Sequence, residues 1–217
     1  MKLKLAVVSI QLAFAAIDFN ISNAGSVAII VLDAEGKPAP NVVVTARPIG
    51  KAMSLVMPVG ATATATMVNQ EKLQFSPYVT VVTAGSSVKF VNKDAFAHHV
   101  KSFSPAKAFE LRMDAAKDGK PNDSVAAVLF DKPGPVALQC HFHNSMRGHV
   151  YVSDTPYFGT TTANGAIVIE GVPEGEVELR AWHPDQFIDQ ATAKVTSGIN
   201  TVNAQMKLNL TPRARRS

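Results

Sequence analysis

The residues best suited to chemistry lie in one short stretch of the chain. Cys140, His143 and Met146 follow one another with the spacing Cys-x2-His-x2-Met. A thiolate, an imidazole and a thioether are soft ligands that suit copper, whereas magnesium and calcium prefer carboxylate and carbonyl oxygens. The thiolate and the imidazole are expected to bind strongly and the thioether to act as a weak axial ligand. The stretch therefore predicts a site for one copper ion.

A copper site of this kind needs a second imidazole, and the pair His98 and His99 lies upstream. Side chains alternate between the two faces of a strand, so the two rings point in opposite directions. Lys101 shares a face with His99 and should face water, which favours His98 as the ligand. Phe103 lies on the same face as His99 and argues the other way, so His99 stays an alternative. The predicted metal ligands are His98, Cys140, His143 and Met146.

Cys140 is the only cysteine of the chain. In an oxidising compartment a single cysteine cannot form an internal disulfide, so it is either buried and inert or occupied by a ligand. Its neighbours favour occupation. Four protein ligands leave no coordination position for a substrate, so we expect an electron carrier and not an enzyme.

The elements that must hold these residues are predicted to be strands, because apolar runs alternate with Gly, Pro and Asn/Asp turns and no apolar stripe at helical spacing persists. The fold class is therefore all-β. Ala126–Phe130 and Val136–Cys140 are expected to form a hairpin, and Ile49–Ala65 a connection. The other expected strands are Ser26–Leu32, Val42–Ala46, Phe75–Thr83, Ser87–Asn92, His98–Phe103, Ala108–Met113, Gly148–Val152, Gly165–Glu170, Val177–Ala181, Gln190–Thr196 and Thr201–Leu208.

The N-terminus has the pattern of a secretory signal peptide. Lys2 and Lys4 precede the apolar run Leu5–Ile17, which is short for a membrane span. Cleavage is expected after Ser22-Asn23-Ala24, with Ala13-Phe14-Ala15 as the other small-residue site and an uncleaved anchor as the alternative. The mature chain is thus expected to lie in the periplasm without inserting into a membrane.

Composition and charge exclude several classes of protein. Hydrophobic residues make up 47% of the 217 residues and charged ones 18%, which argues against a long disordered region. The formal net charge is +4, and part of the excess lies in Arg213, Arg215 and Arg216. No basic stripe with interleaved aromatic residues accompanies this tail, so nucleic acid is not an expected partner.

These features together resemble the plastocyanin–amicyanin branch of the cupredoxins, and still more the exported bacterial proteins often labelled "methylamine utilization protein". The resemblance implies a Greek-key β-sandwich with a type 1 (blue) copper site, in which His98 takes the place of the first histidine ligand. His99 takes the place of an asparagine that braces the ligand loop. The resemblance rests on the segments Gln74–Pro77, Ala84–Val88, Phe90–Asp94, His98–Lys107, Phe130–Gly134, Cys140–Met146 and Asp154–Phe158.

The chain departs from that pattern at two positions. The relatives tend to carry a bulky aromatic residue just before the methionine, where this chain has Ser145, and a residue other than His141 after the cysteine. The first departure is expected to expose the copper or loosen Met146 without removing a ligand. His141 with His143 resembles part of the motif that links coppers in multicopper oxidases, although the preceding histidine is replaced by Gln139.

The segments on either side of the copper unit are each too small to bury a sandwich core alone. Together they resemble a transthyretin-like, carboxypeptidase regulatory-like β-sandwich, with the alternative that the N-terminal strands join the cupredoxin sheet. Trp182 is expected to pack and His183 not to bind copper. The predicted organisation is a signal peptide at 1–24, N-terminal strands of the flanking sandwich at 25–60, the cupredoxin domain at 61–153 and the remainder with its basic tail at 154–217.

The sequence therefore favours a periplasmic blue copper protein that carries single electrons, with a redox partner protein docking near His143. A periplasmic copper buffer, carrier or sensor with the same ligands is the main alternative. An enzyme with a second copper near His141, and a module that binds carbohydrate or protein with only incidental metal, are the remaining hypotheses.

Overall fold

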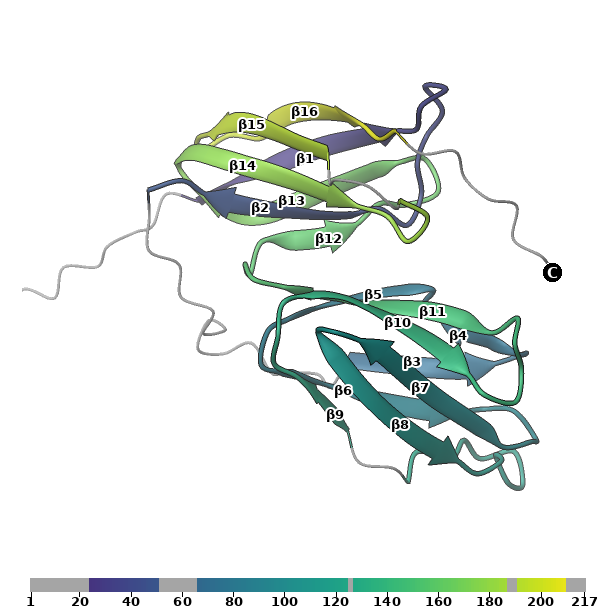
Figure 1. Cartoon of the computed structure of the whole chain (residues 1–217). Coiled ribbons are helices and arrows are strands. Elements are labelled where there is room, and N and C mark those ends of the chain that lie inside the picture. The colour runs from purple at the N-terminus through teal and green to yellow at the C-terminus, as the bar shows by residue number, and fades with distance from the viewer. Residues whose placement is uncertain (1–23, 51–65, 125–126, 187–190, 210–217) are drawn as a thin grey trace, which may run out of the picture.

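The computed structural model describes residues 24–50, 66–124, 127–186 and 191–209. Within these ranges the chain is built of strands and turns (Figure 1), which agrees with the predicted all-β class. The predicted signal peptide and the connection at 51–65 lie outside the described residues. In the described ranges, no helix is long and apolar enough to cross a membrane.

The middle of the chain forms one sandwich of two sheets. A five-stranded sheet has the order β5-β11-β10-β7-β8 and a four-stranded sheet the order β4-β3-β6-β9. The strands are β3 (Thr66–Glu71), β4 (Gln74–Ser76), β5 (Val79–Thr83), β6 (Ser86–Asn92), β7 (His98–Ser104), β8 (Lys107–Met113), β9 (Val128–Phe130), β10 (Gly134–Cys140) and β11 (Arg147–Ser153).

Strand alternation determines which side chains enter the core of this unit. In β10, Val136, Leu138 and Cys140 are buried, whereas Ala137 and Gln139 are partly exposed on the other face. Cys140 thus ends a strand as one more inward side chain, in the same core cluster as Phe90 and Phe130. The pleat itself turns the thiol towards the interior.

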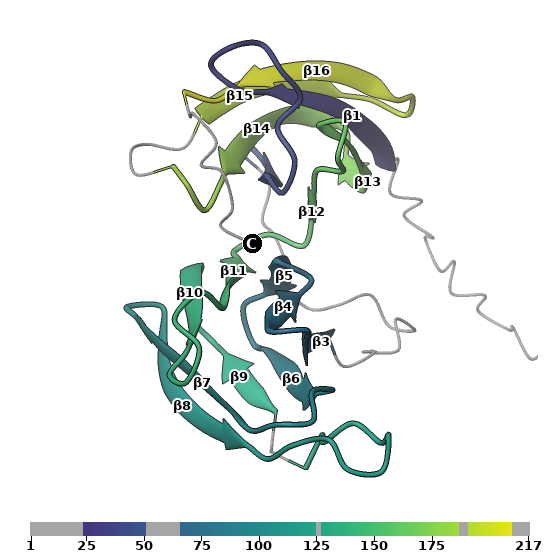
Figure 2. The same cartoon turned by 90° about the vertical axis from the view of Figure 1, so that its right-hand side faces the viewer.

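The two flanking segments combine into a second sandwich (Figure 2). Its sheets have the orders β13-β1-β16 and β12-β2-β14-β15, and their inner faces share one apolar core. Ile29 pairs with Ile167, and Ala28 with Val168, so the N-terminal strands do not join the middle sandwich. The strands are β1 (Ala24–Leu32), β2 (Val43–Pro48), β12 (Phe158–Thr160), β13 (Ala166–Pro173), β14 (Gly175–Trp182), β15 (Ala191–Ser197) and β16 (Val202–Lys207).

The two sandwiches meet at a cluster of aromatic side chains. Trp182 of the flanking unit contacts Tyr151 and His149 of β11, with ring centroids 5.2 and 5.8 Å apart. An ion pair joins Arg47 to Asp154 beside this cluster. Trp182 therefore packs at the junction, as expected from the sequence.

Three details of the strand prediction are wrong. Ala126–Phe130 and Val136–Cys140 do not form a hairpin, because β9 pairs with β6 while β10 pairs with β11 and β7 in the other sheet. The predicted strand Phe75–Thr83 is two strands, interrupted at a cis peptide bond between Ser76 and Pro77. The strands β3 and β12 had no periodic signal strong enough to be predicted.

Gly25 provides a test of the flanking sandwich. A Cβ atom at this position would lie 1.8 Å from the backbone oxygen of Gly198, which cannot move like a flexible side chain. We expect Gly25→Ala to lower the free energy of unfolding by about 3 kcal/mol or more, in the upper range of overpacking. Denaturant unfolding, followed by the fluorescence of Trp182, measures this loss in the free energy of unfolding. Gly198→Ala is the matched control, because its Cβ meets no atom within 4 Å, and equal stability of the two variants would contradict the packing.

Candidate metal centre

Two loops at one end of the middle sandwich bring the predicted ligands together. The first joins β6 to β7 and ends at His98, and the second joins β10 to β11 and contains His143 and Met146. His98 and Cys140 lie at the ends of neighbouring strands, since the register pairs Cys140 with Val100. The sheet fixes two ligands, and the short second loop folds back to supply the others.

The thiol lies between two imidazoles. The Sγ atom of Cys140 is 3.6 Å from Nδ1 of His98 and 3.5 Å from Nδ1 of His143. The ligand atoms of these three residues all lie within 4.8 Å of one another, an arrangement able to hold a metal ion. Cys140 is 3% exposed and His98 is fully buried, while His143 is partly exposed. The site is therefore shielded from water except on the side of His143.

Met146 closes the loop beneath these side chains. Its backbone N–H donates to the carbonyl of His143 at 3.0 Å, and its carbonyl accepts from the N–H of Cys140 at 3.3 Å. Its side chain is buried in the same core cluster as Cys140. Ser145, which takes the place of the bulky aromatic residue of the similar proteins, is exposed and is not part of this core cluster.

The structure brings His98, and not His99, to the thiol. His99 lies on the outer face, where its Nε2 is 3.0 Å from a carboxylate oxygen of Glu110. His141 also turns outward, with Nδ1 3.0 Å from the ammonium of Lys101. Alternation along β7 thus separates the two neighbouring histidines as the sequence indicated.

Asp94 lies in the candidate site and was not singled out from the sequence. Its Oδ2 lies 2.9 Å from Nε2 of His98, so the carboxylate holds the far side of the ring whose Nδ1 faces Cys140. The same carboxylate accepts the backbone N–H groups of Lys72 and Leu73 at 2.7 and 3.2 Å. A carboxylate four residues before a ligand histidine was the available signal, and it fits the pattern by which acceptors orient metal-binding imidazoles.

The carboxyl group of Asp94 is held in its ionised form. Burial acts to raise the pKa of Asp94, but hydrogen bonds from His98 and from the Lys72 and Leu73 backbones lower it below its usual value. The side chain of Asp94 is 10% exposed. A fixed negative charge beside His98 favours the more positive state of any metal held there.

We expect Asp94→Asn to weaken copper binding by about 10- to 100-fold, the usual loss when an acceptor behind a ligand histidine is changed. The reduction potential should rise, because the lost negative charge stabilised the oxidised ion more than the reduced one. Competition with a chelator and redox potentiometry measure the two effects. Asp114→Asn is the control, since its side chain is 77% exposed; an equal change in both variants would contradict the role of Asp94.

Aromatic side chains surround the partly exposed side of the site. Phe96 lies against both of the predicted histidine ligands, with ring centroids 5.3 Å from His98 and 5.4 Å from His143. Phe96 is 42% and Phe142 49% exposed, although both are large apolar residues. His143 therefore reaches solvent next to the exposed apolar side chains of Phe96 and Phe142, which form an apolar rim.

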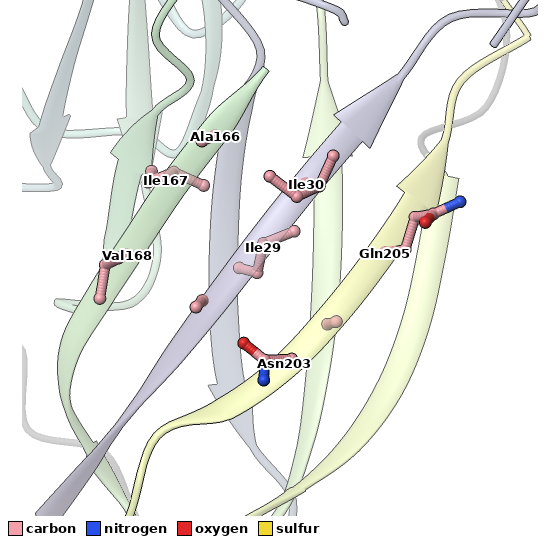
Figure 3. A pocket seen from close by; sticks show the side chains of 9 residues that line it. Ile29, Ile30, Ala166, Ile167, Val168, Asn203 and Gln205 are labelled. Carbon is pink, nitrogen blue, oxygen red and sulfur yellow. The ribbon is translucent and has the colours of Figure 1, made fainter. Parts of the chain in front are cut away.

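A surface hollow in the described part of the chain lies away from this centre. It is on the outer face of the sheet β13-β1-β16 (Figure 3) and contains no ionisable side chain. Ile30, Val168, Asn203 and Gln205 are among its lining residues. The hollow therefore shares no residue with the cluster of His98, Cys140 and His143.

The middle of the chain is similar to a family of copper-binding proteins. Residues 62–153 match the family described as copper binding proteins, plastocyanin/azurin family. No curated protein sequence matches the chain significantly. Similar solved structures include amicyanin from Paracoccus versutus (Thiobacillus versutus), 23% identical with a TM-score of 0.35, covering 50% of this chain and 98% of that one. A reduced amicyanin mutant has 21% identity and a TM-score of 0.35, with 50% and 99% coverage.

The matched family and the donor set agree on the metal. A buried thiolate with two imidazoles and a neighbouring thioether is the ligand set that copper prefers, and all four residues lie inside the matched range. Oxygen donors that would suit magnesium or calcium are not among these ligands. The residues fit a single copper ion.

Proposed function

We propose that this protein is a type 1 (blue) copper protein that carries single electrons between redox partners, with His98, Cys140, His143 and Met146 as the ligands. The observation that carries the proposal is the thiol of Cys140 held between two imidazole Nδ1 atoms at 3.6 and 3.5 Å. Copper supplies the one-electron couple. The chain supplies ligands that are already in place, so little reorganisation accompanies a change of oxidation state.

The surface around His143 supports a role in electron transfer to a protein partner. His143 is the ligand nearest to solvent, and Phe96 and Phe142 present apolar area beside it. Apolar and aromatic surface with few charges suits the centre of a protein interface. A redox partner that docks over this rim comes close to the metal through the imidazole of His143.

The place of action in this proposal is the periplasm. Its support is the positive start and the short apolar run at 5–17, which precede the first described strand, β1. A lone cysteine that serves as a ligand also suits an oxidising compartment, because it leaves no free thiol exposed. The flanking sandwich, in the same proposal, is a transthyretin-like module that carries the copper unit.

Two measurements on the purified full chain test the function. We expect the copper-loaded protein to show intense visible absorption from thiolate-to-copper charge transfer and to cycle reversibly between two oxidation states. Copper should remain bound through many cycles in the presence of a competing chelator. A colourless copper protein would overturn the type 1 site, and release of copper to the acceptor in each cycle would favour the copper-handling alternative.

A further inference from the structure

The outer face of the five-stranded sheet holds a second pair of imidazoles. His99 and His141 directly follow the proposed ligands His98 and Cys140, and alternation turns them to the opposite face of the sheet. The register of β10 on β7 places His141 directly opposite His99, and the N–H of His141 donates to the carbonyl of His99 at 2.9 Å. The two ring centroids are 5.6 Å apart with an interplanar angle of 73°.

A carboxylate and an aromatic ring border this pair. Glu110 Oε1 lies 3.0 Å from Nε2 of His99, which leaves Nδ1 of that ring for another partner. Carboxylates in this position orient metal-binding histidines and raise their basicity. Phe142 contacts both rings, with centroids 5.7 Å from His99 and 5.8 Å from His141, and so covers one side of the pair.

We propose that His99 and His141 bind a divalent transition metal ion of the class that prefers imidazole, such as Zn²⁺, with Glu110 supporting His99. Bonds from such ions to imidazole nitrogen are about 2.0–2.1 Å long. Rings whose centroids are 5.6 Å apart are close enough for one ion to bind both, once a nitrogen of each ring turns towards it. Water completes the coordination, so this ion exchanges with solution, unlike one held at the buried thiolate.

Two arguments favour a site over a chance neighbourhood. His99 and His141 lie far apart along the chain, yet the structure places their rings next to each other on one face of the sheet. The pair also has an acidic neighbour at hydrogen-bond distance. The inference goes beyond electron transfer and does not depend on it.

Lys101 competes with the proposed ion. Its ammonium lies 3.0 Å from Nδ1 of His141, where it donates to a nitrogen lone pair and places a positive charge beside the site. The same ammonium is 5.6 Å from the ring centroid of Phe103, so it keeps a cation–π contact when it moves away from His141. Binding of a cation therefore requires Lys101 to withdraw, and removing this lysine should strengthen the site.

Titration calorimetry of the copper-loaded full chain with Zn²⁺ tests the proposal. We expect one Zn²⁺ ion to bind per chain, and His99→Gln and His141→Gln each to weaken it by about tenfold or more, since even a supporting residue contributes that much. Lys101→Met should tighten binding several-fold. Gln139→Ala, on the same face beside the pair, is the matched control and should leave the affinity unchanged.

The result that would overturn the proposal is Zn²⁺ binding that is absent, or that is equal in the parent chain and in both histidine variants. If the buried centre does not bind copper, the proposed electron-transfer function is wrong. The proposal of an outer Zn²⁺ site can still be tested, by the same titrations on the copper-free chain. The buried residues are common to all variants, so only the outer pair can account for the difference. Denaturant unfolding of each variant confirms that the fold is retained.

Discussion

Replacement of Cys140 by serine should abolish the intense visible absorption of the copper-loaded protein. The band arises from charge transfer out of the thiolate, and a serine oxygen is a harder donor that does not replace it. Copper affinity should fall as well, because the sulfur is the atom shared by the contacts with His98 and His143. The visible spectrum and a chelator competition on the same samples measure both losses.

The control for Cys140→Ser is a comparison of the parent chain and the variant, both without copper. The side chain is buried and nearly isosteric with serine, so the free energy of unfolding without copper should change by only about 1 kcal/mol. Copper at 100 times its dissociation constant adds about 2.7 kcal/mol to a protein that binds it only when folded. The parent chain should gain this increment and the variant should not. An equal gain in both would place the metal elsewhere.

A second large effect separates two neighbouring histidines. His98→Gln should weaken copper binding by more than about 100-fold, because it removes a ligand where the loss of a supporting residue already costs 10- to 100-fold. His99→Gln is the matched substitution and should leave the blue absorption and the reduction potential of the buried centre nearly unchanged. The structural reason is that His98 is fully buried beside Cys140, while His99 lies on the outer face near Glu110.

The copper-free variants again determine what the His98 result means. His98→Gln removes the partner of Asp94 in a buried position, so its unfolding must be compared with that of the parent by Trp182 fluorescence. A folded variant that does not bind copper supports the ligand assignment. If the folded variants at 98 and 99 bind copper equally, the assignment of His98 is wrong.

The side chains that meet at Cys140 were easier to foresee from the sequence than the sheets that hold them. Three of the donor residues lie close together in one short stretch, so their types and spacing are visible in the sequence. For the histidine at the start of a strand, the alternation of side chains between the two faces is enough to predict which way it points. The pairing of β9 depends on a crossover between sheets that no local pattern of residues records, so the predicted hairpin was wrong. The break of Phe75–Thr83 falls at Pro77, whose lack of a backbone N–H was a signal that the prediction overlooked.

Asp94 shows what limits prediction of the site itself. The residue types near His98 were visible in the sequence, but the carboxylate becomes a partner of that ring only because the β3–β4 turn supplies the N–H groups of Lys72 and Leu73. That turn lies far from His98 along the chain. In the same way, the approach of His99 to His141 required the register of β10 on β7.

The order of the strands has a consequence for biosynthesis. β1 and β2 emerge first, yet their sheet partners are β12, β13, β14 and β16, all of which lie beyond the copper unit. The copper unit is built from the contiguous strands β3 to β11, so its sheets can form without the strands on either side of it in the sequence. Closing long loops is the slow part of forming non-local sheets. We therefore expect the site around Cys140 to form before β1 and β2 pair with their partner strands.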